Sequence, residues 1–303
     1  MSKRGTLAAI GAYALWGLLP IYWKAVQSVP ASEILCHRMA WSFVFVALLL
    51  TWKRRWEWIR LVREHTVTLI TFLVSSLFLA LNWLIYIWAV NAGHLVDTSL
   101  GYFINPLFSV LLGVLFLRER LRLWQWVSVG IAACGVAYLT LSYGTFPWVA
   151  LSLATSFGLY GLLRKTAPLD SLEGLSLETA FMFLPALAYL FYLERIGTAS
   201  FGHATATVNA LLALSGVATA LPLLLFAYAA KRVTLATVGI LQYIAPTGQF
   251  LLGVLLYGET FTKTRGIGFS AIWIALFVYS LEGVIERRKM SKKMSKEGLT
   301  TKG

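Results

Sequence analysis

An acidic, an imidazole and a basic side chain lie within six residues, in the segment Glu33-Ile-Leu-Cys-His37-Arg38. On a helix, Glu33 and His37 are four positions apart and point to the same side, and Arg38 lies about 100° further round. A carboxyl and an imidazole at this spacing could exchange protons. A guanidinium beside them could hold an anionic group or orient the carboxylate. The segment is therefore the first candidate for proton transfer or anion binding.

The helix that must position these groups lies in apolar sequence, as does most of the chain. Of the 303 residues, 58% are hydrophobic and 13% are charged, whereas soluble domains are about 25% charged. Windows of about 20 apolar residues can cross roughly 30 Å of hydrocarbon, and spans of this kind form helices in lipid. We therefore expect an all-α integral membrane protein with ten transmembrane helices. The windows are 5–23, 31–52, 66–90, 96–117, 123–142, 146–163, 174–193, 208–230, 233–257 and 266–285.

Ionisable groups at membrane depth cost about 2.5 to 3.5 kcal/mol each on insertion scales, so they persist mainly where they face a cavity or a partner. One interpretation places Glu33, His37 and Arg38 at the outer part of a substrate cavity. The alternative is structural, with Arg38 extended toward the membrane surface and Glu33 as its partner. The sequence leaves both open.

The net charge of +13 is divided unequally between the two sides of the expected bundle. If the N-terminus is cytoplasmic, Arg38 lies inside a span and the far side receives four of the 26 Lys and Arg residues, Lys24, Arg195, Lys263 and Arg265. The remainder, Arg164 and Lys165 among them, face the cytoplasm. This positive-inside asymmetry predicts an even number of spans with both termini cytoplasmic. We interpret the basic tail, residues 287–303, as a cytoplasmic topology anchor that anionic lipid would attract, and not as a nucleic-acid surface.

The two halves of the chain resemble each other on either side of a turn-like segment, residues 142–147. Aligning residues 95–119 with 235–259 gives nine identities in 25, which include Pro106 with Pro246 and Glu119 with Glu259. Because five spans is an odd number, the second copy must have the opposite orientation. We therefore expect two inverted five-helix repeats, residues 1–142 and 146–286. Inverted repeats with a site near the membrane midplane recur in secondary transporters.

Aromatic and amide side chains recur inside the spans. An amide in hydrocarbon needs a partner, so each amide either joins two helices or bonds a substrate. We expect Asn82, Asn105 and Gln242 to orient substrate and the aromatic rings to supply stacking surface. With Glu33, His37 and Arg38, the predicted substrate pathway contains Trp16, Tyr22, Asn82, Trp83, Tyr102, Asn105, Gln242 and Tyr243.

Pro106 and Pro246 fall inside corresponding spans, where each frees a carbonyl and permits a bend, so we predict helix-break hinges at both. Glu119 and Glu259 precede the fifth and tenth spans and are predicted to cap their N-termini. Glu178 is the remaining carboxylate inside a span.

Motifs of catalysis are missing from the sequence. It has no G-x-x-x-x-G-K-[ST] phosphate loop, no H-E-x-x-H helix and no nucleophile elbow. Cys36 and Cys134 lie in different spans without metal-ligand spacing. We therefore expect no enzyme, no metal and no cofactor.

The polar and aromatic strings inside the spans resemble those of the RarD branch of the EamA drug/metabolite transporter superfamily. The similar segments are residues 13–24, 33–42, 82–91, 99–107, 160–165, 222–226, 242–247 and 257–259. The resemblance covers nearly the whole chain. It implies a ten-helix, inverted five-plus-five fold in the bacterial inner membrane and secondary transport of small solutes, typically export.

The expected function is secondary transport of small metabolites or drugs by alternating access, with export as the direction and proton coupling left open. The alternatives are a non-transporting membrane scaffold or receptor, and a passive channel. The expected partners are a small-molecule substrate and the lipid bilayer, with no nucleic acid and with the oligomeric state left open.

Overall fold

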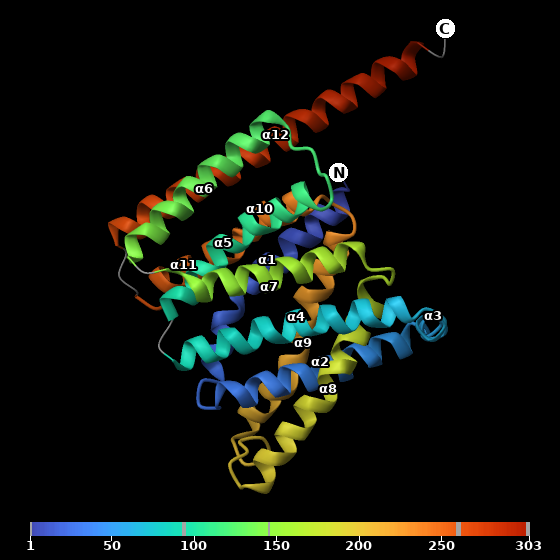
Figure 1. Cartoon of the computed structure of the whole chain (residues 1–303), viewed down its shortest axis with the longest axis vertical. Coiled ribbons are helices and arrows are strands. Elements are labelled where there is room, and N and C mark those ends of the chain that lie inside the picture. The colour runs from blue at the N-terminus through green and yellow to red at the C-terminus, as the bar shows by residue number, and fades with distance from the viewer. Residues whose placement is uncertain (1, 93–94, 145, 259–261, 301–303) are drawn as a thin grey trace. The chain divides into compact units, whose positions relative to one another are not determined.

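The computed structural model describes residues 2–92, 95–144, 146–258 and 262–300, which form twelve α-helices and no strand (Figure 1). The helices are α1 (Lys3–Ala25), α2 (Ala31–Trp52), α3 (Trp58–Glu64), α4 (Thr66–Asn91), α5 (Leu95–Leu115), α6 (Leu123–Tyr143), α7 (Trp148–Thr166), α8 (Ser171–Arg195), α9 (Ala206–Ala230), α10 (Leu235–Gln242), α11 (Ile244–Leu255) and α12 (Lys263–Thr300). The expectation of an all-helical fold is confirmed for these residues.

Eight apolar segments within the described residues are long enough to cross a membrane. They correspond to α1, α2, α4, α6, α8, α9, the combined stretch of α10 and α11, and α12. The two other predicted spans are the helices α5, whose apolar part is Leu100–Leu115, and α7, which has 19 residues. The chain is therefore a multi-pass membrane protein.

Polar residues and glycines fix where several helices begin and end. Ser2, Thr205 and Thr234 accept a hydrogen bond from a backbone amide in the first turn of α1, α9 and α10, which is the usual role of an N-cap hydroxyl. Gly144 ends α6 with φ of 72°, a left-handed conformation that glycine adopts without strain.

The chain divides into two compact units. The first contains Met1–Glu119 and Pro147–Glu259, and the second contains Arg120–Phe146 and Thr260–Gly303. In the second unit α6 packs along α12, and the Ser128 hydroxyl on α6 donates to the Ala275 carbonyl of α12 at 2.7 Å. The boundary between the predicted repeats is therefore not a boundary between compact units, because each half contributes four spans to the first unit and its last span to the second.

Helix contacts in the first unit fall into matching pairs. If α1, α2, α4 and α5 correspond to α7, α8, α9 and α10–α11, then the contact of α1 with α9 matches that of α7 with α4. The contact of α2 with α9 likewise matches α8 with α4, and α1 with α11 matches α7 with α5. Contacts of α2 with α8 and of α5 with α10 join corresponding helices. This is the pattern expected of two copies related by an approximate two-fold axis.

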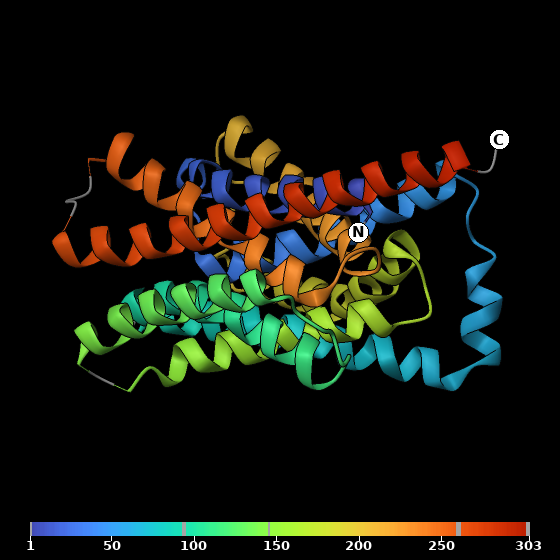
Figure 2. The same ribbon diagram turned by 90° about the horizontal axis from the view of Figure 1, so that it is seen from above.

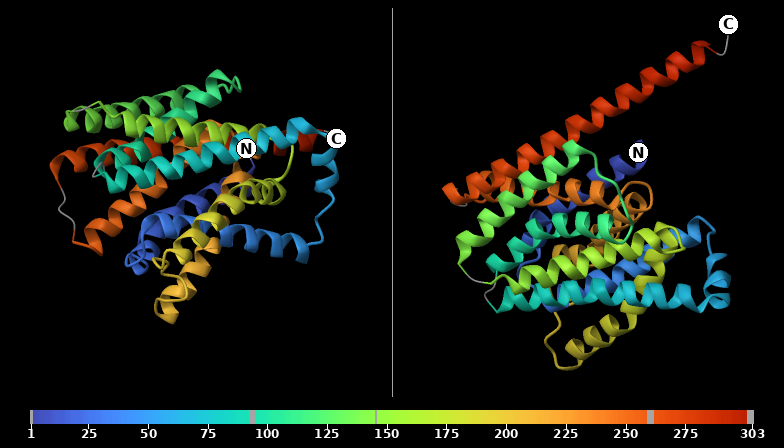
Figure 3. Two further views of the ribbon diagram at one scale, coloured as in Figure 1. Left: turned by 60° about the horizontal axis from the view of Figure 1, so that its bottom comes forward. Right: turned by 45° about the horizontal axis from the view of Figure 1, so that its top comes forward.

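Two connections lie next to α2, the helix that carries Glu33, His37 and Arg38. Figure 2 shows the short helix α3 lying across the ends of α2 and α4, which it connects. Figure 3 shows α8 and α9 leading into the loop that joins them, residues 196–205. This loop contacts Glu33, as described below.

The two predicted proline breaks differ. Between α10 and α11 the helix is interrupted at Tyr243, three residues before Pro246, as the loss of the proline amide would favour. By contrast, α5 continues through Pro106 as one helix from Leu95 to Leu115. The prediction that Pro106 breaks its span is therefore wrong, because the flanking turns keep their own helical hydrogen bonds.

Glycines permit the closest helix approaches in the first unit. A Cβ at Gly216 on α9 would overlap the backbone and Cβ of Trp41 on α2, and the neighbouring Ser42 hydroxyl donates to the Gly216 carbonyl at 3.1 Å. On the other side of the bundle a Cβ at Gly248 would lie 3.2 Å from the Cα of Gly17. Small residues at such positions allow helix backbones to pack together in a membrane.

Gly216→Ala is expected to lower the free energy of unfolding by about 1–3 kcal/mol, because the added methyl group forces α9 away from α2. The measurement is the thermal midpoint of the purified protein in detergent. Gly130→Ala on α6 is the matched control, since nothing lies within 4 Å of a Cβ at that position. Equal midpoints for the two variants would contradict the close contact.

Candidate functional site

A cavity of about 680 Å³ lies within the first unit. Its walls come from α1, α2, α4, α5, α7, α9, α10 and α11. At one end it is lined by Lys24, Gln27 and Ala31, where α1 ends and α2 begins, and this is called the Lys24 end. It reaches inward to Tyr13, Leu223 and Gln242. This volume is in the range of cavities that hold small molecules.

The cavity brings together eight of the thirteen residues predicted for the pathway and hinges. These are Trp16, Arg38, Asn82, Trp83, Tyr102, Asn105, Gln242 and Pro246. They come from six helices, so no single segment of sequence contains the site. The remaining five, Tyr22, Glu33, His37, Pro106 and Tyr243, are not part of its described lining.

Arg38 occupies the cavity wall between two indole rings. Its guanidinium carbon lies 4.7 Å from the ring centroid of Trp23 on α1 and 4.8 Å from that of Trp83 on α4. Its Nε donates to the hydroxyl of Thr219 on α9 at 3.0 Å. Cation–π contacts of this kind strengthen where water is excluded, and here they hold the guanidinium in a fixed position.

Glu33 faces away from this cavity toward the loop between α8 and α9. Its carboxylate, which is fully buried, accepts hydrogen bonds from the Ser200 amide at 2.7 Å, the Ser200 hydroxyl at 2.9 Å and the Phe201 amide at 3.1 Å. These three donors satisfy most of the acceptor capacity of the carboxylate. Glu33 is thus an anchor for the loop, and the donors that orient its carboxylate are those of Ser200 and Phe201 and not Arg38.

His37 lies beside Glu33 on the same face of α2, as its spacing predicted. Its Nε2 is 3.8 Å from a Glu33 carboxylate oxygen, and its ring packs 4.8 Å from that of Phe201. Both ring nitrogens are buried and have no hydrogen-bond partner among the described residues. The predicted trio is therefore divided, with Glu33 and His37 against the loop and Arg38 in the cavity.

The three predicted amides are in different situations. Asn82 on α4 donates to the Leu153 carbonyl at 2.9 Å and the Ser156 hydroxyl at 3.0 Å, so it joins α4 to α7 while lining the cavity. The Asn105 and Gln242 oxygens are buried and have no partner within the described part of the chain. Both residues line the cavity, although these two oxygens are covered by protein atoms.

Two predicted tyrosines serve packing instead. The Tyr22 hydroxyl donates to the Leu211 carbonyl, which joins α1 to α9. Tyr243 is fully buried at the α10–α11 break and donates to the Phe103 carbonyl on α5 at 3.1 Å. Tyr102, in contrast, lines the cavity with its ring 6.2 Å from that of Tyr86.

The sequence interpretation missed several lining residues. Tyr13 is fully buried, and its hydroxyl has no partner among the described residues. Its ring lies 5.5 Å from that of Trp16, and Phe157 on α7 lies 5.8 Å from Trp16. The spacing of Tyr13 and Trp16, three residues apart on one helix face, was an available signal. No comparable signal marks Phe157, which reaches the site only through the packing of α7.

The opposite end of the first unit holds a cluster of charge-assisted contacts, which we call the Glu119 latch and which contains Glu119, Lys165, the end of α9 and the start of α10. Glu119 accepts from the backbone amides of Leu235 at 2.6 Å and Ala236 at 2.9 Å, at the start of α10. Lys165 lies 3.7 Å from the Glu119 carboxylate. Its ammonium donates to the carbonyls of Ala230 at 3.0 Å and Val233 at 2.5 Å.

The prediction that Glu119 caps the fifth span is therefore wrong. That helix, α6, already has a partner for its first amide, because the Gln125 side chain accepts from the Arg122 backbone at 2.9 Å. Arg118 adopts φ of 52°, and the Glu119 amide donates back to the Gly113 carbonyl at 3.0 Å, so the chain reverses and presents Glu119 to α10. Glu259, its counterpart in the second half, lies outside the described residues.

A second buried ionic group involves Glu178 on α8. Its carboxylate accepts from Ser75 at 2.5 Å and Tyr160 at 3.4 Å and lies 3.6 Å from the guanidinium of Arg164. Arg164 and Glu178 are both fully buried. Arg164 therefore does not extend into solvent, because the helix continues two residues past it and α8 covers it.

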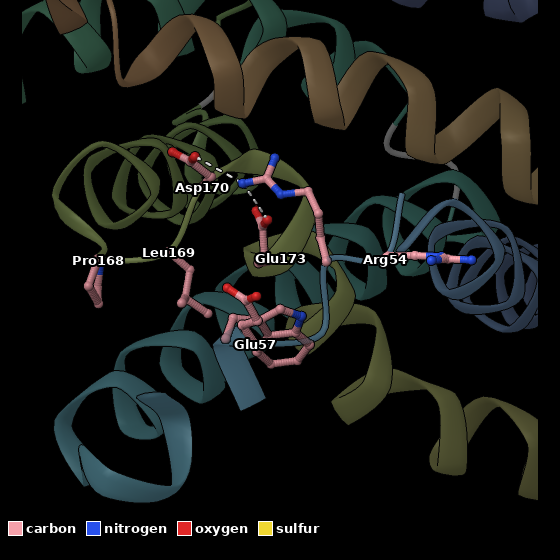
Figure 4. A pocket seen from close by; sticks show the side chains of 8 residues that line it. Arg54, Glu57, Pro168, Leu169, Asp170 and Glu173 are labelled. Atoms are coloured by element: carbon pink, nitrogen blue, oxygen red, sulfur yellow. Dashed lines mark ion pairs between the residues drawn. The ribbon is translucent and has the colours of Figure 1, made fainter. Parts of the chain in front are cut away.

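A smaller hollow of about 390 Å³ lies where the α2–α3 and α7–α8 connections meet (Figure 4). The Arg55 guanidinium there lies 2.8 Å from Glu173 and 3.6 Å from Asp170, and Figure 4 shows both carboxylates directed at it. Because these ion pairs connect the segment after α2 to the start of α8, we interpret the hollow as a structural joint.

Glu33→Ala is expected to increase the hydrogen-exchange rates of the Ser200 and Phe201 amides tenfold or more, because hydrogen bonds to a buried carboxylate contribute about 1.5–3 kcal/mol each. Hydrogen–deuterium exchange with mass spectrometry measures this. Glu64→Ala, which removes an exposed carboxylate on α3, is the control and should leave these amides unchanged. Unaltered exchange in Glu33→Ala would show that the loop does not depend on this anchor.

Comparison with known proteins agrees with this architecture. The EamA-like transporter family matches the chain twice, over residues 3–141 and 147–281. The chain is 49% identical to an uncharacterized transporter of Vibrio cholerae, covering 93% of this chain and 94% of that protein. It is 46% identical to Protein RarD of Streptomyces exfoliatus, covering 95% and 91%, and 40% identical to Protein RarD of Escherichia coli (strain K12), covering 96% and 98%.

A solved crystal structure with 19% sequence identity superposes with a TM-score of 0.69 over 93% of this chain and 98% of that chain, which shows a shared fold. The two family matches fall on the two halves identified from the sequence. The alignments with proteins named RarD cover 95% and 96% of this chain, so the similarity extends over nearly all of the helices described above. The chain is a membrane transporter that belongs to the RarD branch of the EamA-like transporter family.

Proposed function

We propose that this protein is a secondary transporter that exports a small molecule through the central cavity by alternating access. The observation that carries the proposal is the asymmetry of the first unit. The cavity is lined from the Lys24 end to the middle of the bundle, whereas the other end holds the Glu119 latch. Alternating access requires a pathway whose two ends differ, with a cavity that extends to one end and contacts that close the other.

Ten spans in two inverted repeats, residues 1–142 and 146–286, are part of this proposal. The eight long apolar segments together with α5 and α7 make ten, and the matched helix contacts support the repeat. The basic residues favour a cytoplasmic position for both termini and therefore for the Glu119 latch. In that orientation the Lys24 end of the cavity faces the outside of the cell, and the Glu119 latch lies on the cytoplasmic side.

The break between α10 and α11 is the proposed hinge for the change between states. It lies beside Gln242, whose side chain lines the cavity, and Pro246 cannot donate a backbone hydrogen bond across it. Because α10 begins at the Glu119 latch, a change of angle at Tyr243 would couple release of the latch to the cavity wall. Pro246 is accordingly proposed as a hinge, and Pro106 as a weaker flexible point within an unbroken helix.

We propose a proton gradient as the driving force. The support is the buried pair of Glu33 and His37, whose closest oxygen and nitrogen are 3.8 Å apart. His37 has two unpartnered ring nitrogens among the described contacts, so a proton could be added there without displacing an existing hydrogen bond.

Proteoliposomes with an imposed proton gradient test the function against its alternatives. We expect saturable movement of at least one solute from a panel of metabolites and antibiotics, with a rate that falls when an uncoupler removes the gradient. Non-saturable flux without response to the gradient would indicate a passive channel. No flux of any solute would indicate a scaffold or receptor, and either result would overturn the proposal.

The Glu119 latch yields a separate prediction. In a background of Cys36→Ser and Cys134→Ser, a cysteine introduced by Asn105→Cys reports access to the cavity. Glu119→Gln should increase its labelling by an impermeant maleimide from the Glu119 side about tenfold, equivalent to about 1.4 kcal/mol, because the amides of α10 lose a charged acceptor. Inside-out vesicles provide this side.

Glu64→Gln is the matched control, since Glu64 pairs with Arg60 on the exposed face of α3. The labelling rate should be unchanged there. If Glu119→Gln also leaves the rate unchanged while the protein remains folded, the cluster does not hold that end closed.

A further inference from the structure

We propose that the cavity selects an organic anion with a planar apolar body, and that Arg38 binds its anionic group. This inference rests on the proposed function in taking the cavity as the substrate's path, and it names the chemical class of that substrate.

The charges that line the cavity all have one sign. Among the described lining residues, Arg38 and Lys24 are cationic, and there is no Asp or Glu. Glu33, the carboxylate on the same helix as Arg38, is saturated by donors of the α8–α9 loop. A cation as substrate would therefore meet two like charges, whereas an anion would meet two opposite ones.

The environment of Arg38 leaves part of its guanidinium available. Trp23 and Trp83 cover it at 4.7 and 4.8 Å, and among the described residues Thr219 bonds its Nε. Its two terminal nitrogens have no hydrogen-bond partner in the described part of the chain. A guanidinium with this free edge can bind a carboxylate or phosphate through two parallel hydrogen bonds. Such binding would offset the cost of holding a cation among apolar helices.

The rest of the lining specifies the body of the ligand. Trp16, Phe157, Tyr86 and Tyr102 provide aromatic surface on several sides of the cavity. Asn105 and Gln242 line the same space. The ligand class is thus an aromatic or similarly flat molecule with a carboxylate or phosphate at one end.

Lys24 extends the positive surface to the entrance of the cavity. Its ammonium lies 3.7 Å from the ring centroid of Tyr257 and its side chain is exposed at the Lys24 end. A cation at this place would attract an anionic solute toward Arg38, since like-signed charges along a cleft steer an oppositely charged ligand.

Three probes with the same phenyl body test the inference on the purified full-length protein: 3-phenylpropionate, 3-phenylpropionamide and 3-phenylpropylamine. Isothermal titration calorimetry measures their binding without any need for transport. We expect the anion to bind wild-type protein at least tenfold more tightly than the amide, and the amine to bind most weakly. Equal affinities, or tighter binding of the amine, would overturn the inference on wild-type protein alone.

Variants of Arg38 test whether this residue causes the preference for the anion over the amide. Arg38→Gln should bring the affinities for anion and amide within about threefold of each other, and Arg38→Lys should retain part of the preference because it keeps the charge. Arg195→Gln is the matched control, since Arg195 also lies over an aromatic ring, 5.0 Å from Phe191, but outside the cavity. A preference that survives in Arg38→Gln would assign the anion to another site.

Two further outcomes are informative. If acetate and inorganic phosphate bind as tightly as 3-phenylpropionate, the site takes small anions and the aromatic lining plays no part, which overturns the proposed ligand class. Arg38-dependent binding of the anion without any transport in proteoliposomes would contradict the proposed function and leave the anion site standing. Transport of other solutes without charge selection would overturn the anion site and leave the proposed transport function standing.

Discussion

A charged or hydrogen-bonding group enclosed by apolar helices is costly unless it has a partner, and the polar residues of the bundle meet this constraint to different extents. Glu33 and Glu119 are saturated by backbone amides from other segments, and Glu178 is neutralised by Arg164 with support from hydroxyl groups. Among the described residues, Asn105, Gln242 and Arg38 line the cavity and keep polar atoms without a hydrogen-bond partner, whereas His37 and Arg164 keep such atoms away from the cavity. The difference lies in the surroundings of each group, not in its residue type.

The saturated groups are placed where helices from the two halves of the chain meet. Glu33 joins α2 to the loop after α8, and Glu119 joins the end of α5 to the start of α10. Glycine contacts bring the intervening helices close enough for these bonds, as at Gly216 against Trp41. Apolar helices have little hydrophobic reason to associate in lipid, so small residues and polar bonds must supply much of the specificity. Joints of this kind therefore fix how helices of the two halves pack against each other.

The contacts at the two ends of the first unit differ in kind. At the Glu119 end, a carboxylate meets the positive end of α10, and a lysine meets the carbonyls that end α9. At the Lys24 end, the cation contacts an aromatic ring, and the neighbouring residues line a cavity. In the proposed alternating-access cycle, equivalent charge-assisted bonds at the Lys24 end would have to replace those of the Glu119 latch for the two states to be similar in free energy.

Much of the architecture follows from the sequence alone. Long apolar windows determine membrane helices, because lipid offers no partner for an exposed backbone, and identities between residues 95–119 and 235–259 indicate the duplication. Residue type was also sufficient to select Trp16, Arg38, Asn105 and Gln242, since such side chains are rare in hydrocarbon unless they have a task.

Tertiary structure alone decided which polar groups are joints and which face the cavity. Glu33 and Arg38 are five residues apart, yet one contacts Ser200 and the other Thr219, because adjacent faces of one helix meet different neighbours. Glu119 precedes α6 in the chain but binds α10, more than a hundred residues away, because its turn points it there. Sequence spacing fixes the direction of a side chain about its own helix, whereas the partner in that direction depends on how distant helices pack.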